Sequence, residues 1–242
     1  MSGAIPALTT EQMREVDRLM SEEYGITLIQ MMENAGRSLA ELARRLIGGD
    51  VRGQRIAVLC GAGNNGGGGL VGARHLSNWG ASVQITLAAS PEQLKNVPAH
   101  QWRTLSRLPV ERIVYNPDIP PDLSPADAVL DALIGYGLRG SPRGAAADLI
   151  RLTNAASCLT IALDAPSGLD TTSGVPGDPC LRADATLTLA LPKVGLLTPE
   201  ARPVVGELYL ADISVPPTLY EELGLPPPQV FDHDTIVQVS FP

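Results

Sequence analysis

Residues 58–76 read VLCGAGNNGGGGLVGARHL, and this stretch decides the fold. It completes a short apolar run at 55–60 that is rich in strand-forming residues, and it leads into helical spacing at 69–80. Gly61, Gly63 and Gly66 match the pattern GxGxxG between the two. Such glycines let backbone approach a phosphate, and the N-terminus of the next helix supplies N–H donors. A tight strand-to-helix turn needs the same glycines, so the match alone leaves both interpretations open.

Apolar strands alternate with helices along the rest of the chain, which predicts an α/β protein with a parallel sheet covered on both faces. Thr9 and Gln12 are spaced as a capping box for a helix that starts near Thr10. Pro98 is expected to interrupt a helical segment at 91–108. The other predicted helices are 27–47, 69–80 and 144–156, and the predicted strands are 55–60, 81–88, 111–115, 127–133, 158–166, 184–191 and 205–213.

Composition predicts one compact soluble domain over residues 1–242, with N-terminal helices in 1–50 and a proline-rich wrap at 216–242. The net charge of −8 argues against nucleic-acid binding. The start of the chain has no leader pattern, and no window approaches the roughly 18 apolar residues of a membrane span. We therefore expect a cytoplasmic protein. The three cysteines form no CxxC pair and are predicted to be reduced packing residues: Cys60, Cys158 and Cys180.

Polar chemistry follows three of the predicted strands. GAGNNGGGG comes after 55–60, Asp131 precedes IGYGLRGSPRG, and Asp164 precedes APSGLD. Each has a purely structural interpretation, as a turn asparagine or as a carboxylate that caps a turn. Because ligands bind beyond the carboxyl ends of parallel strands, their coincidence predicts one shared crevice. The glycines lack the Lys-Ser or Lys-Thr of a P-loop, and the next strand, ending TLAASPE, lacks the acid that binds ribose, which argues against an NAD-dependent dehydrogenase.

Five segments in order resemble the YjeF N-terminal domain family: MMENAG, CGAGNNGGGGLVGARHL, LDALIGYGLRG, LDAPSGLDTTSG and ADATLTLALPKVGLL. The resemblance runs from about Thr9 to about Leu219. It implies a Rossmann-like three-layer αβα sandwich with a mostly parallel sheet. It also implies an epimerase that interconverts the R and S forms of hydrated NADH and NADPH in metabolite repair. Because the chain ends at Pro242, the dehydratase that repairs the S form is expected to be a separate protein, and a homodimer is a further expectation from the family.

Carried onto matching positions, the resemblance implies a potassium ion held by Asn65, Asp131 and Ser167. One carboxylate among neutral oxygens suits a monovalent cation. Asp164 and Lys193 become candidates for acid–base catalysis, although Lys193 without the family would be taken for a solvated loop lysine. The implied substrate-binding residues are Asn64, Asn65, Gly66, Gly67, Gly68, Gly135, Tyr136, Gly137, Leu138, Arg139, Gly140, Ser141 and Asp164.

Two positions depart from the family pattern. Gly68 stands where the family has an aspartate, and Tyr136 stands where a threonine is more usual. The alternative is therefore a degenerate, non-catalytic member that binds a nucleotide-like ligand or a protein partner. The three histidines are isolated in the sequence and are expected to be structural or superficial: His75, His100 and His233.

Overall fold

The computed structural model describes residues 5–241, and its eight strands form one sheet in the order β3-β2-β1-β4-β5-β6-β7-β8. All neighbouring strands run parallel except β7 and β8. The order reverses between β1 and β4, as in dinucleotide-binding folds. The strands are β1 (Arg55–Cys60), β2 (Ser82–Leu87), β3 (Glu111–Val114), β4 (Ala128–Ala132), β5 (Leu159–Leu163), β6 (Ala185–Leu189), β7 (Glu207–Ala211) and β8 (Ile236–Val239).

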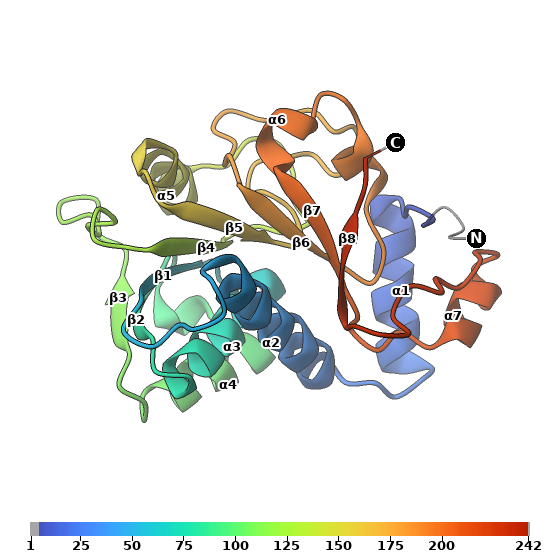
Figure 1. Cartoon of the computed structure of the whole chain (residues 1–242), viewed down its shortest axis with the longest axis horizontal. Coiled ribbons are helices and arrows are strands. Elements are labelled where there is room, and N and C mark those ends of the chain that lie inside the picture. Colours follow the sequence, from blue (N-terminus) through green and yellow to red (C-terminus); the bar gives the residue numbers. More distant parts are fainter. Residues whose placement is uncertain (1–4, 242) are drawn as a thin grey trace.

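Helices cover both faces of this sheet, which confirms the predicted three-layer α/β fold. In Figure 1, α2, α3 and α4 lie under one face, α5 and α6 lie over the other, and α1 and α7 stand beside β8. Within residues 5–241, no helix combines the length and the apolar character that a bilayer crossing demands. The helices are α1 (Thr10–Glu22), α2 (Leu28–Leu46), α3 (Asn64–Asn78), α4 (Asn96–Leu105), α5 (Gly144–Ala155), α6 (Arg202–Val205) and α7 (Pro217–Glu222), with 3-10 turns η1 (Pro91–Gln93) and η2 (Val194–Leu197).

Helix α1 begins where the capping box predicts. The Thr9 hydroxyl accepts a hydrogen bond from the Gln12 N–H at 3.1 Å, and the Gln12 side chain accepts one from the Thr9 N–H at 2.9 Å. Two N–H groups that a helix start leaves free are thereby satisfied. Met13, Val16 and Met20 lie at helical spacing on one face of α1, and all three are buried. This buried face packs α1 against the rest of the protein, and the helix carries residues of the site described below.

Helix α3 starts at Asn64, five residues before the predicted segment at 69–80. Glycine is a poor helix former, and the run of glycines therefore concealed the first turns. Packing overrides the propensity: a Cβ on Gly66 would overlap the Gly61 carbonyl, and a Cβ on Gly69 would lie 2.5 Å from Ala132 Cβ. Only glycine lets α3 approach β1 and β4 this closely.

Two other differences concern proline-containing segments. Pro98 lies in the first turn of α4, where an N–H has no intrahelical partner, and so it does not break that helix. The break precedes α4, between η1 and Asn96. The predicted wrap at 216–242 contains α7 and an unforeseen strand, β8, which pairs antiparallel with β7. Residues 1–4 and 242 of the predicted domain lie outside the described residues.

Substitution of Gly66 by alanine tests the close approach of α3. We expect Gly66→Ala to lower the free energy of unfolding by about 2–3 kcal/mol, because the new Cβ would overlap the Gly61 carbonyl. Gly137→Ala is the matched control, since a Cβ on Gly137 would meet nothing within 4 Å, and it should change the value by less than about 0.5 kcal/mol. Guanidinium unfolding monitored by circular dichroism measures both. Equal stability of the two variants would contradict this role for Gly66.

Candidate active site

A cavity of about 480 Å³ opens at the carboxyl ends of the strands, beside the reversal point between β1 and β4. The loops after β1, β4 and β5 all contribute to it, so the three strand ends share one crevice as expected. The predicted residues on its wall are Asn64, Asn65, Gly68, Gly135, Tyr136, Gly137, Arg139 and Asp164. The predicted substrate residues away from the wall are Gly66, Gly67, Leu138, Gly140 and Ser141.

A buried ion pair joins Asp164, which lines the cavity, to Lys193, which does not. Lys193 Nζ donates to Asp164 Oδ1 at 2.5 Å, to the Leu189 carbonyl at 3.0 Å and to Thr188 Oγ1 at 3.2 Å. The Lys193 side chain is fully buried, so this residue is no solvated loop lysine. Three oxygen acceptors satisfy the three donors of its ammonium group. The pair therefore holds the Asp164 carboxylate at a fixed place next to the cavity.

The backbone at Asp164 is constrained. Its φ of 69° lies in the left-handed region, which aspartate tolerates better than most residues. Its second oxygen, Oδ2, accepts a hydrogen bond from the Tyr136 N–H at 2.8 Å. Gly135 makes this approach possible, because a Cβ there would lie 2.7 Å from Asp164 Oδ2 and 3.2 Å from Asn65 Oδ1. The loop after β4 thus presses against both the Asp164 carboxylate and the first turn of α3.

Asp131 and Ser167 form a second buried polar group behind the first. Ser167 donates to Asp131 twice, from Oγ to Oδ1 at 2.7 Å and from its N–H to Oδ2 at 2.8 Å. The Leu133 N–H donates to Oδ1 at 3.1 Å. Burial raises the pKa of Asp131 to about 6, although the hydrogen bonds from Ser167 and Leu133 oppose the shift. Within residues 5–241 no cationic side chain forms an ion pair with this carboxylate, so its buried charge lacks compensation.

Asn65 is the third residue implied as a metal ligand. It is the second residue of α3, and its Nδ2 atom is buried without a hydrogen-bond partner among the described residues. Direct hydrogen bonds join Asp131 to Ser167. Asn65 lines the cavity close to Gly135, whereas Asp131 and Ser167 are fully buried and do not line it. The available donors are amide, carboxylate and hydroxyl oxygens, the ligands that hard cations prefer. A carboxylate without an ion-pair partner, a hydroxyl oxygen and an amide oxygen are ligand types that fit a monovalent cation. The unpartnered Asn65 Nδ2 is an N–H donor and does not bear on that fit.

Helix α1 supplies residues that the sequence analysis missed. Met13, Arg14 and Asp17 line the cavity, and Asp17 Oδ2 accepts a hydrogen bond from the Tyr136 hydroxyl at 2.5 Å. One signal was available, because Asp17 follows Met13 by four residues and so shares the inner face of the helix. The Tyr136 ring forms part of the wall, and the cavity remains open beside it.

The two departures from the family pattern have different surroundings. A Cβ on Gly68 would lie 2.8 Å from Leu163 Cδ2, so a leucine borders the place of the missing aspartate. Met31 and Met32 on α2 are buried and also line the cavity. This wall is therefore apolar, whereas the wall formed by Tyr136 is polar.

His75 and the three cysteines do not line the cavity. His75 Nε2 on α3 lies 2.8 Å from Glu33 Oε1 on α2, so this histidine joins two helices. Cys60 is buried, and burial raises the pKa of its thiol. Cys158 and Cys180 are half-buried and free. Their thiol pKa values are also raised, and none of the three lines the cavity.

Comparison with known proteins gives a consistent set of relatives. Residues 28–195 match the family model described as YjeF-related protein N-terminus. The NAD(P)H-hydrate epimerase of Dehalogenimonas lykanthroporepellens is 46% identical over 222 residues, covering 92% of this chain and 87% of that protein. The corresponding epimerase of Truepera radiovictrix is 38% identical over 91% of this chain and 95% of its own length.

Two further comparisons bear on length and fold. The bifunctional NAD(P)H-hydrate repair enzyme Nnr of Moorella thermoacetica is 41% identical over 88% of this chain, which spans only 41% of that enzyme. The crystal structure of yeast ynu0 superposes with a TM-score of 0.79, covering 97% of this chain and all of the yeast chain at 22% identity. At that identity the likeness supports the fold alone. The family model and the epimerase relatives show that this chain belongs to the YjeF N-terminal domain family.

Proposed function

We propose that this protein is an NAD(P)H-hydrate epimerase, which interconverts the R and S forms of hydrated NADH and NADPH. The observation that carries the proposal is the buried Asp164–Lys193 pair beside an open cavity at the strand ends. A buried charge pair is costly to maintain, and its position at a cleft indicates a functional site. The relatives at 46% and 38% identity are named for this activity.

The epimerisation requires an acid group and a base group positioned next to the hydrated carbon. In the hydrate, a ring carbon carries a hydroxyl next to the ring nitrogen. Loss of that hydroxyl, or opening of the ring at that carbon, removes the stereocentre, and readdition from the other face inverts it. An acid protonates the departing oxygen and a base takes the proton back. Asp164 is the proposed acid–base group, and Lys193 orients its carboxyl group through the contact at 2.5 Å.

The walls of the cavity suit the two ends of such a substrate. Asn64 and Asn65 at the start of α3 line the cavity. The first N–H groups of a helix have no intrahelical partners, so they can bind phosphate oxygens. Arg14 and Arg139 line the same cavity and add positive charge in a protein whose net charge is −8. The apolar wall at Met31 and Met32 can pack against the nicotinamide ring.

Potassium binding at Asn65, Asp131 and Ser167 is part of the proposal. When bound, the cation would supply the positive charge that the buried Asp131 carboxylate lacks among the described residues. Asn65 would thereby be held in position at the start of α3. No step of the epimerisation needs to pass through the ion, because its place is structural in this scheme.

A non-catalytic role is the alternative that Gly68 suggests. Against it, Asp164 and Lys193 are present, paired and buried, and Tyr136 leaves the cavity open. The proposed S product would pass to a dehydratase, the second kind of activity in repair of this type. A cytoplasmic location and a homodimer stay predictions of the sequence.

The epimerase proposal is tested by supplying the pure R hydrate and following formation of the S form by chromatography. The wild-type protein should accelerate conversion well above the rate in buffer. Asp164→Asn should reduce kcat by about 10²- to 10⁴-fold, because the amide neither gives nor takes a proton. A wild-type protein that binds the nucleotide and leaves the rate unchanged would favour the non-catalytic alternative.

The ion pair itself is tested through stability. Lys193→Met should lower the free energy of unfolding by about 3–5 kcal/mol, because the buried Asp164 would lose the partner of its ion pair. The double variant with Asp164→Asn should recover a large part of this loss, since no charge is then left unpaired. Denaturant unfolding of the four proteins of this cycle measures the coupling. Additive effects of the two substitutions would mean that the pair contributes no coupling.

The cation site is tested by thermal unfolding in different salts. Potassium chloride should raise the melting temperature of the wild-type protein more than lithium chloride at equal ionic strength, because binding to the folded state alone stabilises it. Ser167→Ala should remove most of this difference, since it deletes one oxygen beside Asp131. Thr153→Ala is the control, a buried hydroxyl on α5 that bonds the Leu149 carbonyl at 2.9 Å and lies outside the site. An identical response to both salts in the wild-type protein would contradict the cation site.

A further inference from the structure

Asp17 brings a second carboxyl group into the cavity, from an element far from the strand ends in sequence. It belongs to α1, lines the cavity, and accepts a hydrogen bond from the Tyr136 hydroxyl at 2.5 Å. The same Tyr136 donates its N–H to Asp164 Oδ2 at 2.8 Å. One residue therefore joins the two carboxyl groups of the cavity, with its backbone on Asp164 and its phenol on Asp17.

The two carboxyl groups differ in their charged partners. Asp164 is paired with Lys193, whereas Asp17 forms no ion pair among the described residues. Burial raises the pKa of Asp17, and the charge of Asp164 adds to this shift, while Tyr136 and Lys193 oppose it. The charged and titratable groups that face it are Arg14 on its own helix, Tyr136 after β4, Asp164 after β5 and Lys193 after β6. Two acids in one cavity with different surroundings are suited to opposite roles in proton transfer.

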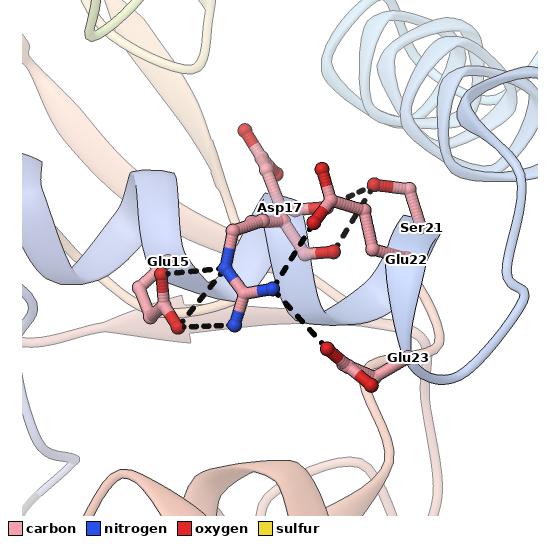
Figure 2. A network of polar contacts seen from close by, with 6 residues as sticks. Glu15, Asp17, Ser21, Glu22 and Glu23 are labelled. Atoms are coloured by element: carbon pink, nitrogen blue, oxygen red, sulfur yellow. Dashed lines mark hydrogen bonds and ion pairs between the residues drawn. The ribbon is translucent and has the colours of Figure 1, made fainter.

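The outer face of α1 shows that Asp17 is not simply one more surface acid. There the Arg18 guanidinium binds Glu15 at 2.8 Å, Glu22 at 3.1 Å and Glu23 at 3.3 Å (Figure 2). The Asp17 carboxylate takes no part in this network. It bonds instead to Tyr136, on the cavity side of the helix.

We propose that Asp17, hydrogen-bonded to Tyr136, is the second proton-transfer group of the site, acting opposite Asp164. The inference rests on the proposed epimerase function and deepens it. An inversion at carbon needs a proton delivered on one face and removed on the other, and one carboxyl group at a fixed place serves a single face. Two carboxyl groups that reach the cavity from α1 and from the end of β5 meet this requirement.

The step balances with one proton shared between the two groups. The protonated carboxyl gives its proton to the hydroxyl, the C–O bond breaks with its electrons going to oxygen, and water departs while the ring nitrogen lone pair forms a C=N bond. Water then adds to the opposite face of that carbon, the C=N electrons return to nitrogen, and the second carboxylate accepts the proton. No oxidation occurs, and the reverse reaction uses the groups in exchanged roles.

The experiment compares the wild-type protein with Asp17→Asn, Tyr136→Phe and the control Glu15→Gln, in both directions of the reaction. Asparagine can still accept the Tyr136 hydrogen bond, so the wall should keep its shape. We expect Asp17→Asn to reduce kcat by about 10²-fold or more in each direction with little change in KM. Tyr136→Phe should reduce kcat about tenfold, because one hydrogen bond to the acid is lost. Glu15→Gln removes a carboxylate from the outer face of the same helix and should leave both constants unchanged.

The pH profile adds a readout that a packing role would not change. The wild-type kcat should fall as the pH rises and the pair loses its shared proton, and Asp17→Asn should lose that decline. If the Asp17→Asn variant keeps the kcat of the wild-type protein, whether or not its KM rises, the inference is overturned while the epimerase proposal stands. No acceleration by the wild-type protein would instead overturn the proposed function. If the Asp17→Asn variant does not fold, the Tyr136→Phe variant tests the inference. An unchanged kcat and pH profile in that variant would also contradict the role of Asp17.

Discussion

The buried contact between Lys193 and Asp164 is the interaction on which the site depends. A lysine is tolerated in the interior here because the Asp164 carboxylate, the Leu189 carbonyl and the Thr188 hydroxyl take up its three donors. The contact joins the end of β5 to the segment after β6, and Asp164 in turn holds the loop after β4 through the Tyr136 N–H. Three strand ends are thus fixed to one another by charge and hydrogen bonding, and the cavity takes its shape from them.

The second constraint is the distance between α3 and the sheet. Gly61 and Gly66, two of the three glycines in the GxGxxG match, serve packing, because a Cβ at either would overlap a backbone carbonyl. Only Gly63 of the three lines the cavity. The glycine pattern therefore reports how closely the helix approaches the strands. The phosphate binding proposed at the N-terminus of α3 would follow from that approach, since Asn64 and Asn65 line the cavity and the first N–H groups of a helix have no intrahelical partners.

Much of the fold followed from periodicity, and the missing parts have physical explanations. Apolar runs between helical segments correctly predicted the parallel strands and the polar loops that follow them, because hydrophobic periodicity is a local property of the sequence. The start of α3 was missed because contacts with β1 override the low helix propensity of glycine. Strand β8 depends on pairing with β7, which no local pattern encodes. Lys193 entered only through the family resemblance, since charge by itself indicates a surface residue. The role of Asp17 depends on where α1 packs.

The position of Asp17 also bears on what Gly68 means. Loss of the family aspartate would argue for a degenerate site if it removed the one carboxylate near the mouth of the cavity. Here the cavity contains the carboxylates of Asp17 and Asp164, and Leu163 borders the place that a side chain at Gly68 would enter. The bulky Tyr136, the other departure from the family pattern, is the residue that binds Asp17. The two departures therefore coexist with an open cavity lined by two carboxyl groups, one of them paired with the buried Lys193, as the proposed epimerisation requires.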